Sequence, residues 1–347
     1  MGQAVRGTMN TAAVYRLNNI LHREDIMHLK KILAAGAIAT MASPAFAAFP
    51  EKPITLVVGF GAGGGTDSYA RALASVAPTY INNQPLIIVN KAGGSGVPAA
   101  KYVADSKPDG YTLYLASGGS FYFSTQFRKA PVDPFKDFKI VCMVGRLLPA
   151  VFVHKESKFK TAKELVDHVK ANPGKLRYST PGRTSTWGIA GLAFAKRNNL
   201  KAVDVPAKGG SPARGLLIGK QVDFSVIGVH LINGFQDQVK ALGLIYPERD
   251  PNNKKIPTVK EQGLNLLEVF TPMIIMAPKA VSDKRIAALD GACKNMTGHK
   301  AYGKLLKKAG LPAKYKAGPA TLSYYKGLTK QWKPLVDELK AASKKKK

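Results

Sequence analysis

The chain is poor in the residues from which catalytic and metal sites are most often built. It has two cysteines, Cys142 and Cys293, and six histidines among 347 residues. No histidine pair has the H-E-x-x-H spacing of a zinc-binding helix, and no serine lies in a G-x-S-x-G turn. The sequence therefore predicts no metal, no cofactor and no catalytic residue.

Acidic residues are also scarce. Asp and Glu number 22 against 52 Lys and Arg, a formal net charge of +30. Such an excess favours an anionic partner, whether nucleic acid, an acidic lipid surface or a small anion. The basic residues are spread along the chain, apart from a run at 344–347, and no basic stripe alternates with aromatic residues. Nucleic-acid binding is therefore not expected, whereas capture of an anionic solute and adhesion by charge alone both stay open.

No apolar run is long enough for a permanent membrane span. A short apolar segment at 32–41 follows basic residues and precedes Ala45-Phe46-Ala47, which is the pattern of a signal peptide. We expect translation to start at Met27 and cleavage to follow Ala47. An exported chain permits a bond between Cys142 and Cys293. Cys142 lies in an apolar run, however, where a buried thiol is equally natural, so the sequence leaves the bond open.

The most informative motif is a strand followed by a glycine loop and a helix. Ile54–Val58 reads as a short β-branched strand, and five glycines follow within 59–65. Helical spacing then begins, with Thr66 or Asp67 expected as the N-cap. Glycines let a ligand approach the backbone closely, and a helix start offers unpaired N–H groups. The motif therefore predicts an anion site.

A dinucleotide is one candidate anion, because Gly59, Gly61 and Gly64 match G-x-G-x-x-G. That fingerprint also requires an acidic residue at the end of the second strand, to hold the ribose. The second strand here ends at Asn90, and the loop lacks the Gly-Lys-Ser/Thr of a P-loop. A nucleotide-dependent enzyme is therefore the weaker alternative, and a tight turn without a ligand is the other.

The rest of the chain alternates short apolar strands with helical patterns, which predicts an α/β architecture with largely parallel sheets. Ligands bind beyond the carboxyl ends of strands in such sheets. The loops after four expected strands are therefore the candidate site, the strands being 54–58, 111–117, 176–180 and 222–229. Thr161 and Glu164 form a capping box, and helices are expected over 282–310 and 319–343.

Seven sequence blocks resemble the solute-binding proteins of the tripartite tricarboxylate transporter family, also called Bug proteins. The blocks cover most of 48–347 in order: FPEKPITLVVGFGAGGGTD, KAGGSGVPAA, PDGYTLYLASGG, VDPFKDF, ELVDHVKANPGKLRYSTPG, VPAKGGSPARGLLIGKQVDF and IPTVKEQG. The resemblance implies a two-lobed periplasmic binding protein (type II, Venus-flytrap) with two crossing hinge segments. It implies a receptor, not an enzyme, that captures a di- or tricarboxylate or similar acid for a membrane permease.

The same resemblance suggests how the chain divides. We expect lobe 1 to comprise 48–147 and 272–347, and lobe 2 to comprise 148–271, with 1–47 as upstream segment and signal peptide. A monomer in the periplasm is expected. The alternatives are a periplasmic enzyme that uses the loop Gly59–Gly64 for a nucleotide, and an orphan sensor receptor for the same acid.

We expect loop N–H groups and hydroxyls, rather than a charged clamp, to bind one carboxylate, and we expect Arg183 to bind a second. Departures from the family pattern at Gly59, Ser95, Ala207, Ile227 and Arg183 suggest that the far end of the pocket is altered. The predicted ligand-binding residues are Phe60, Gly61, Ala62, Gly63, Gly64, Thr66, Asp67, Ser95, Ser117, Gly118, Ser120, Thr180, Gly182, Arg183, Thr184, Ser185, Lys208, Gly209 and Ser211.

Overall fold

The computed structural model describes residues 49–344, so the predicted leader and cleavage site lie outside the described residues. The strands are β1 (Ile54–Val58), β2 (Leu86–Asn90), β3 (Thr112–Ser117), β4 (Phe138–Leu147), β5 (Pro149–His154), β6 (Arg177–Thr180), β7 (Val203–Pro206), β8 (Phe224–Gly228), β9 (Val239–Leu244), β10 (Thr271–Pro278) and β11 (Ala313–Ala317). The α-helices are α2 (Gly65–Ala74), α3 (Val97–Ala104), α4 (Gly118–Phe127), α5 (Ala162–Ala171), α6 (Thr186–Arg197), α7 (Gly210–Ile218), α8 (Asp283–Gly298), α9 (Lys300–Lys308) and α10 (Gly318–Lys344). Four short 3₁₀ turns are η1 (Ala77–Tyr80), η2 (Gly94–Gly96), η3 (Val229–Ile232) and η4 (Lys260–Gln262).

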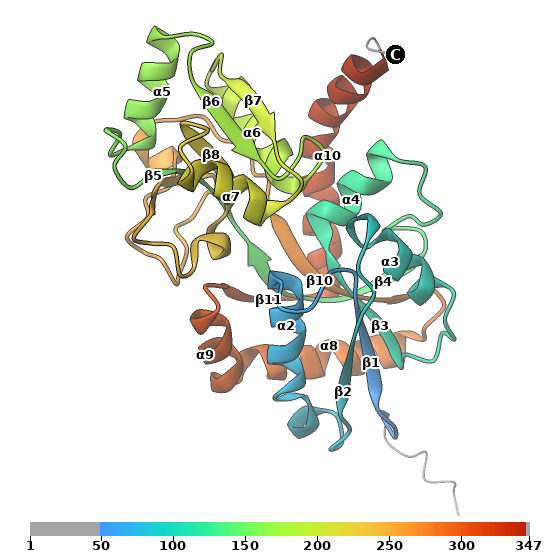
Figure 1. Cartoon of the computed structure of the whole chain (residues 1–347). Coiled ribbons are helices and arrows are strands. Elements are labelled where there is room, and N and C mark those ends of the chain that lie inside the picture. The colour runs from blue at the N-terminus through green and yellow to red at the C-terminus, as the bar shows by residue number, and fades with distance from the viewer. Residues whose placement is uncertain (1–48, 345–347) are drawn as a thin grey trace, which may run out of the picture. The chain divides into compact units, whose positions relative to one another are not determined.

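The strands form two sheets, each covered by its own helices (Figure 1). One sheet has six strands in the order β11-β4-β10-β3-β1-β2, and the other has five in the order β7-β6-β8-β5-β9. We call them, with their helices, the six-stranded lobe and the five-stranded lobe. This is the two-lobed α/β fold that the family resemblance implies.

The chain passes between the lobes through long strands. β4 ends at Leu147 in one sheet, and β5 begins at Pro149 in the other, so only Leu148 separates them. The return segment reaches β10, whose first residue, Thr271, pairs with Leu147. Both passages therefore lie side by side between the two lobes.

The sheets are mixed, and the expectation of largely parallel sheets was wrong. Among the described residues, four strand pairings are parallel and five are antiparallel. The antiparallel pairings all involve β4, β5 or β10. A strand that enters a sheet directly from the other lobe has no helical crossover to reverse its direction, and parallel neighbours require such a crossover.

The expected helices around the strands are present. Thr161 caps α5 by accepting the N–H of Glu164 at 3.1 Å, and the Glu164 carboxylate accepts the N–H of Lys160 at 2.7 Å, which confirms the capping sequence. The long helix α10 packs on β4 and α4 of the six-stranded lobe. Its buried Trp332 donates from Nε1 to the carbonyl of Glu268 at 2.7 Å, next to the return passage.

The two cysteines form a disulfide, which answers the question that the sequence left open. Cys142 on β4 is bonded to Cys293 on α8, across a sequence separation of 151 residues. Both residues are almost fully buried. The bond therefore fixes a helix of the C-terminal segment to the sheet of the six-stranded lobe.

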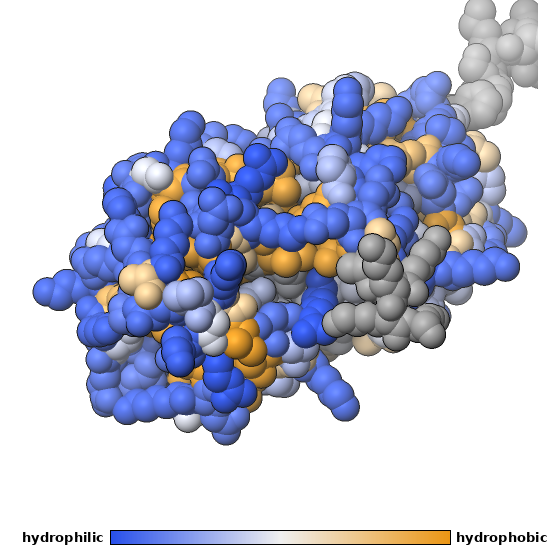
Figure 2. All heavy atoms as spheres, turned by 90° about the horizontal axis from the view of Figure 1, so that it is seen from above, coloured by the Kyte–Doolittle hydropathy of each residue, from blue (hydrophilic) through white to orange (hydrophobic). Residues whose placement is uncertain are grey.

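Hydrophilic residues cover most of the surface seen from above, with smaller hydrophobic areas between them (Figure 2). Within residues 49–344, no helix combines the length and the apolar character that crossing a membrane requires.

Candidate functional site

A cavity of about 390 Å³ lies where loops of both lobes meet. The loop after β1 and the end of β3 contribute from the six-stranded lobe, and the loops after β6 and β8 contribute from the five-stranded lobe. These are the four strands whose carboxyl ends the sequence nominated. The volume is at the lower end of the range of about 300–1,000 Å³ for small-molecule pockets, so it suits a small solute.

The glycine loop leads into α2 two or three residues earlier than expected. The N-cap is Gly64, not Thr66 or Asp67, and the first helical residue is Gly65. Asp67 is the third residue of the helix, from which its carboxylate reaches back to accept the N–H of Gly63 at 2.8 Å. A side chain at this position can satisfy an N–H before the helix without capping it, as the acid of a capping box does.

Asp67 is the centre of a buried hydrogen-bond network that shapes the loop. Its carboxylate accepts Nε of Arg71 at 2.7 Å and Nδ2 of Asn90 at 2.9 Å. Asn90 also donates to the carbonyl of Phe60 at 3.0 Å. Burial favours the neutral acid, but the bonds from Arg71, Gly63 and Asn90 outweigh it and hold the pKa of Asp67 below its ordinary value. A dinucleotide-binding protein has an acidic residue at the end of its second strand. Here that position is Asn90, whose amide donates hydrogen bonds that hold the glycine loop.

The network decides which loop donors remain available. The N–H of Gly63 is used by Asp67, and the N–H of Gly64 is directed to the carbonyl of Gly61 at 3.4 Å. Gly65 and Thr66, the first residues of α2, have no acceptor for their N–H groups within the helix. They line the cavity, so they are the donors that a ligand can reach.

Four helices begin at this cavity. The N-cap or first residues of α2, α4, α6 and α7 all line it. Each helix start carries unpaired N–H groups and roughly half a positive charge. Among the described residues that line the cavity there is no Asp, Glu, Lys or Arg, so helix ends and hydroxyl groups provide the positive potential. This arrangement can hold a small anion without a salt bridge.

The structure brings about half of the predicted site residues to the cavity. Those that line it are Phe60, Gly64, Thr66, Ser95, Ser117, Ser120, Thr184, Ser185 and Gly209. Those outside its lining are Gly61, Ala62, Gly63, Asp67, Gly118, Thr180, Gly182, Arg183, Lys208 and Ser211.

Arg183 lies outside the cavity lining in this structure. Its Nε donates to Oδ2 of Asp204 at 2.6 Å, and its side chain is 63% exposed. Asp204 lies on β7, an edge strand of its sheet. To bind a second carboxylate in the cavity, as the sequence hypothesis has it, Arg183 must first leave Asp204.

Several lining residues were missed by the sequence analysis: Gly65, Leu147, Pro181, Thr186, Trp187, Gly210, His230, Leu231 and Thr271. Most are glycines or apolar residues, which carry no sequence signal for a ligand. His230 is different, because it directly follows the predicted strand 222–229 and could have been found by asking which polar residues come next. Thr186 links the lobes through a hydroxyl contact of 3.1 Å with Ser120.

Two lobes joined by crossing strands, with an uncharged cavity between their loops, define the class of two-lobed solute receptors. The family model described as "Tripartite tricarboxylate transporter family receptor" matches residues 70–341. The chain therefore belongs to the tripartite tricarboxylate transporter receptor family.

Individual relatives agree with this assignment. A protein encoded upstream of gbd in Cupriavidus necator is 30% identical over 311 residues, which are 88% of this chain and 94% of that one. Protein BugT of Bordetella pertussis is 28% identical over 277 residues, which are 76% of this chain and 83% of that one. Among solved structures, MatC from Rhodopseudomonas palustris with bound malate has a TM-score of 0.69 at 25% identity and covers 83% of this chain and 100% of its own.

Proposed function

We propose that this chain is a periplasmic receptor that binds a small organic carboxylate, of the di- or tricarboxylate class, and delivers it to a tripartite tricarboxylate-type permease. One observation carries the proposal: four helix starts converge on a small cavity whose lining has no charged side chain. The family supports the receptor role, and the relative with bound malate supports the ligand class.

The cavity offers a carboxylate two kinds of hydrogen-bond donor, backbone N–H groups and hydroxyl groups. The N–H groups of Gly65 and Thr66 can bind one anionic group at the start of α2, and each hydrogen bond to a charged acceptor contributes about 1.5–3 kcal/mol. The hydroxyl groups of Ser117 and Ser120 add neutral donors at the start of α4, whereas the Ser185 hydroxyl at the start of α6 already donates to the carbonyl of Gly182. Apolar side chains of Leu147, Trp187 and Leu231 complete the wall, so the body of the ligand is expected to be short and carbon-rich.

A thermal-shift screen of mono-, di- and tricarboxylates, followed by calorimetry, tests the proposal. A carboxylate present at 100 times its Kd should stabilise the protein by about 2.7 kcal/mol. The neutral amide of the same acid is the matched control and should give no shift, because it lacks the charge that the helix ends attract. NAD and ATP serve as controls for the nucleotide alternative.

Two outcomes would refute the carboxylate function. Binding of NAD or ATP at micromolar concentration, with no response to any acid, would favour an enzyme. Salt-sensitive adhesion to anionic vesicles without any small ligand would show that the net charge of +30 is the functional feature, since screening weakens exposed charges far more than buried ones.

A further inference from the structure

His230 lies where the two lobes meet at the cavity. It lies in η3, directly after β8 of the five-stranded lobe, and its ring faces Gly65 at the start of α2 in the other lobe. A methyl group on Gly65 would lie 3.3 Å from Nε2 of His230. A methyl group on Gly228 would lie 2.8 Å from Nδ1 and 2.6 Å from Cε1. Two glycines thus make room for the ring, which holds Nε2 next to the start of α2.

The other ring nitrogen has no partner. Nδ1 of His230 is buried and makes no hydrogen bond with any described residue. An unsatisfied buried polar atom costs about 1–3 kcal/mol, so its presence in a native fold calls for a reason. The ring lines the cavity, so its surroundings change when a ligand enters.

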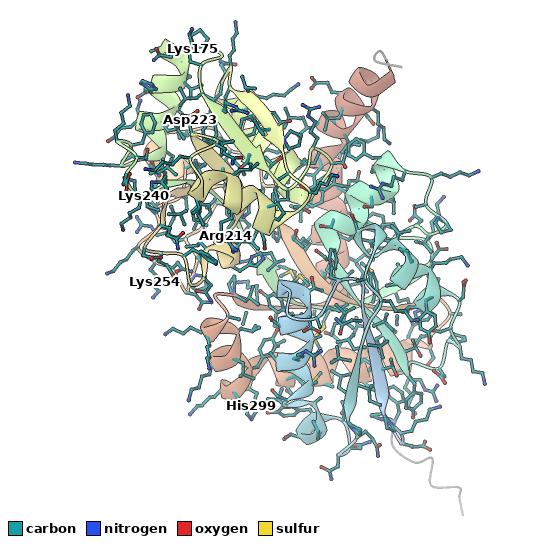
Figure 3. All side chains as sticks on the ribbon, viewed as in Figure 1. Lys175, Arg214, Asp223, Lys240, Lys254 and His299 are labelled. Carbon is teal, nitrogen blue, oxygen red and sulfur yellow. A yellow bond between two sulfur atoms is a disulfide. The ribbon has the colours of Figure 1, made fainter. Side chains whose placement is uncertain are left out.

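His230 is the one titratable side chain among the lining residues. The charged groups on the elements packed around it are Asp67 and Arg71 on α2, Arg146 on β4, Arg214 on α7 (Figure 3), and Lys208 before α7. Asp67 and Arg71 bond to each other. Arg146 bonds to Tyr246 and Glu248, Arg214 donates to the carbonyl of Leu231, and Lys208 is exposed.

Burial alone lowers the pKa of His230 to about 4, so the imidazole is neutral at pH 7.

We propose that His230 is a ligand contact that takes up a proton when an organic carboxylate binds at the start of α2. The inference rests on the proposed function. A carboxylate on the N–H groups of Gly65 and Thr66 would lie beside Nε2, and an opposite charge within about 4–6 Å favours the protonated ring. Imidazolium carries an N–H on each ring nitrogen, so Nε2, which faces the start of α2, would donate to that carboxylate.

The sign of the pH dependence follows from linkage. Because the complex binds more protons than the free receptor, carboxylate affinity should rise as the pH falls below the pKa of His230 in the complex. The rise should end near pH 4, where the free receptor is protonated as well. Each unit by which the ligand raises the pKa of His230 corresponds to a tenfold gain in affinity across that window.

Calorimetry with malate as the probe tests the proposal. Titrations at pH 5.5 and pH 8, each in two buffers of different ionisation enthalpy, count the protons taken up on binding. For the wild type we expect proton uptake at pH 5.5 and an affinity at least about tenfold above that at pH 8. His230→Gln keeps a polar side chain that cannot titrate. In this variant the proton uptake and the additional affinity at pH 5.5 should vanish. Protonation of malate itself affects both proteins alike and cancels in the comparison.

His168→Gln is the matched control, since His168 is half-buried on α5 and does not line the cavity. It should behave as the wild type. Histidine Cε1–H signals in NMR, with His230 assigned by its loss in His230→Gln, provide a second readout: a low titration midpoint without malate and a higher one with it.

Malate binding with equal proton uptake in wild type and His230→Gln would overturn the inference and leave the carboxylate function intact. A His230 midpoint near 6.5 in the free protein, the ordinary value for histidine, would overturn it as well. If neither malate nor any acid of the screen binds, the proposed function fails, and this inference fails with it.

Discussion

The side-chain amide of Asn90 donates to the carboxylate of Asp67 at 2.9 Å, and through Asp67 it holds the glycine loop in place. In a dinucleotide-binding fold this strand end would carry an acid for the ribose. Here the donor binds a carboxylate that belongs to the protein itself. Asn90 therefore stands in place of the acid that would bind a ribose, and its amide supports the loop that leads into α2.

Asn90→Asp should lower the free energy of unfolding by about 2–4 kcal/mol at pH 7. The change removes two donated hydrogen bonds and places a second carboxylate against buried Asp67. Urea unfolding measures the loss. Asn295→Asp, an equal change of charge at an exposed position of α8, should stay within about 0.5 kcal/mol. Equal losses in the two variants would mean that net charge, not the network, is responsible.

The pKa of Asp67 is lowered in the folded protein, so its ionised form stabilises the fold above the unfolded value of 3.8. This stabilisation is lost as the pH falls through the folded pKa. Asp67→Asn should therefore be less stable than the wild type at pH 7, while losing less stability between pH 4 and pH 2. Asp105→Asn, in an exposed pair with Lys101, is the control and should follow the wild-type curve. If Asp67→Asn lost as much stability as the wild type between pH 4 and pH 2, the proposed role of this carboxylate would be contradicted.

Strong local patterns made much of the fold predictable, and the weak patterns account for what was missed. β1 and β3 are apolar and buried, and their expected bounds differ little from those observed. β11 has the sequence AKYKA and β7 is exposed at a sheet edge, so neither shows the apolar run of a buried strand. The carboxyl-end rule located the four loops of the cavity. It could not tell which residues of each loop face inward, because that depends on how the other lobe packs against them.

The disulfide between Cys142 and Cys293 should contribute about 2–4 kcal/mol to stability, because it closes a long loop and restricts the unfolded chain. Reduction should lower the melting temperature of the wild type. A Cys142→Ala, Cys293→Ala double variant should already melt lower and should not respond to the reductant. An equal response of both proteins would assign the effect to the reductant instead. Neither cysteine lines the cavity, so ligand binding at low temperature should be retained.

The sequence hypothesis for Arg183 expects its guanidinium to bind the far carboxylate of a dicarboxylate. On that hypothesis Arg183→Ala should weaken the best dicarboxylate by about 2 kcal/mol or more and its monocarboxylate analogue little, as truncating one partner of a charged pair does. Asp204→Asn, which removes the present partner of Arg183, should strengthen dicarboxylate binding. Small and equal changes for both ligands, in calorimetric titrations of both variants, would instead make Arg183 and Asp204 a surface ion pair.

Gly65→Ala tests most directly whether the carboxylate binds at the start of α2. A methyl group there would lie 3.3 Å from both His230 and Leu147, which is tighter than ordinary packing, and it would stand beside the N–H groups that the ligand needs. Affinity for the best carboxylate should therefore fall about tenfold or more.

Stability should not fall in parallel, since alanine favours a helix over glycine by about 0.5–1 kcal/mol. Gly61→Ala is the matched control: it lies in the same loop, outside the cavity lining, and a methyl group there meets nothing within 4 Å. Calorimetry should show wild-type affinity for Gly61→Ala. If Gly65→Ala also binds as the wild type does, the carboxylate is not held at the start of α2, and the starts of α4, α6 and α7 are the remaining candidates.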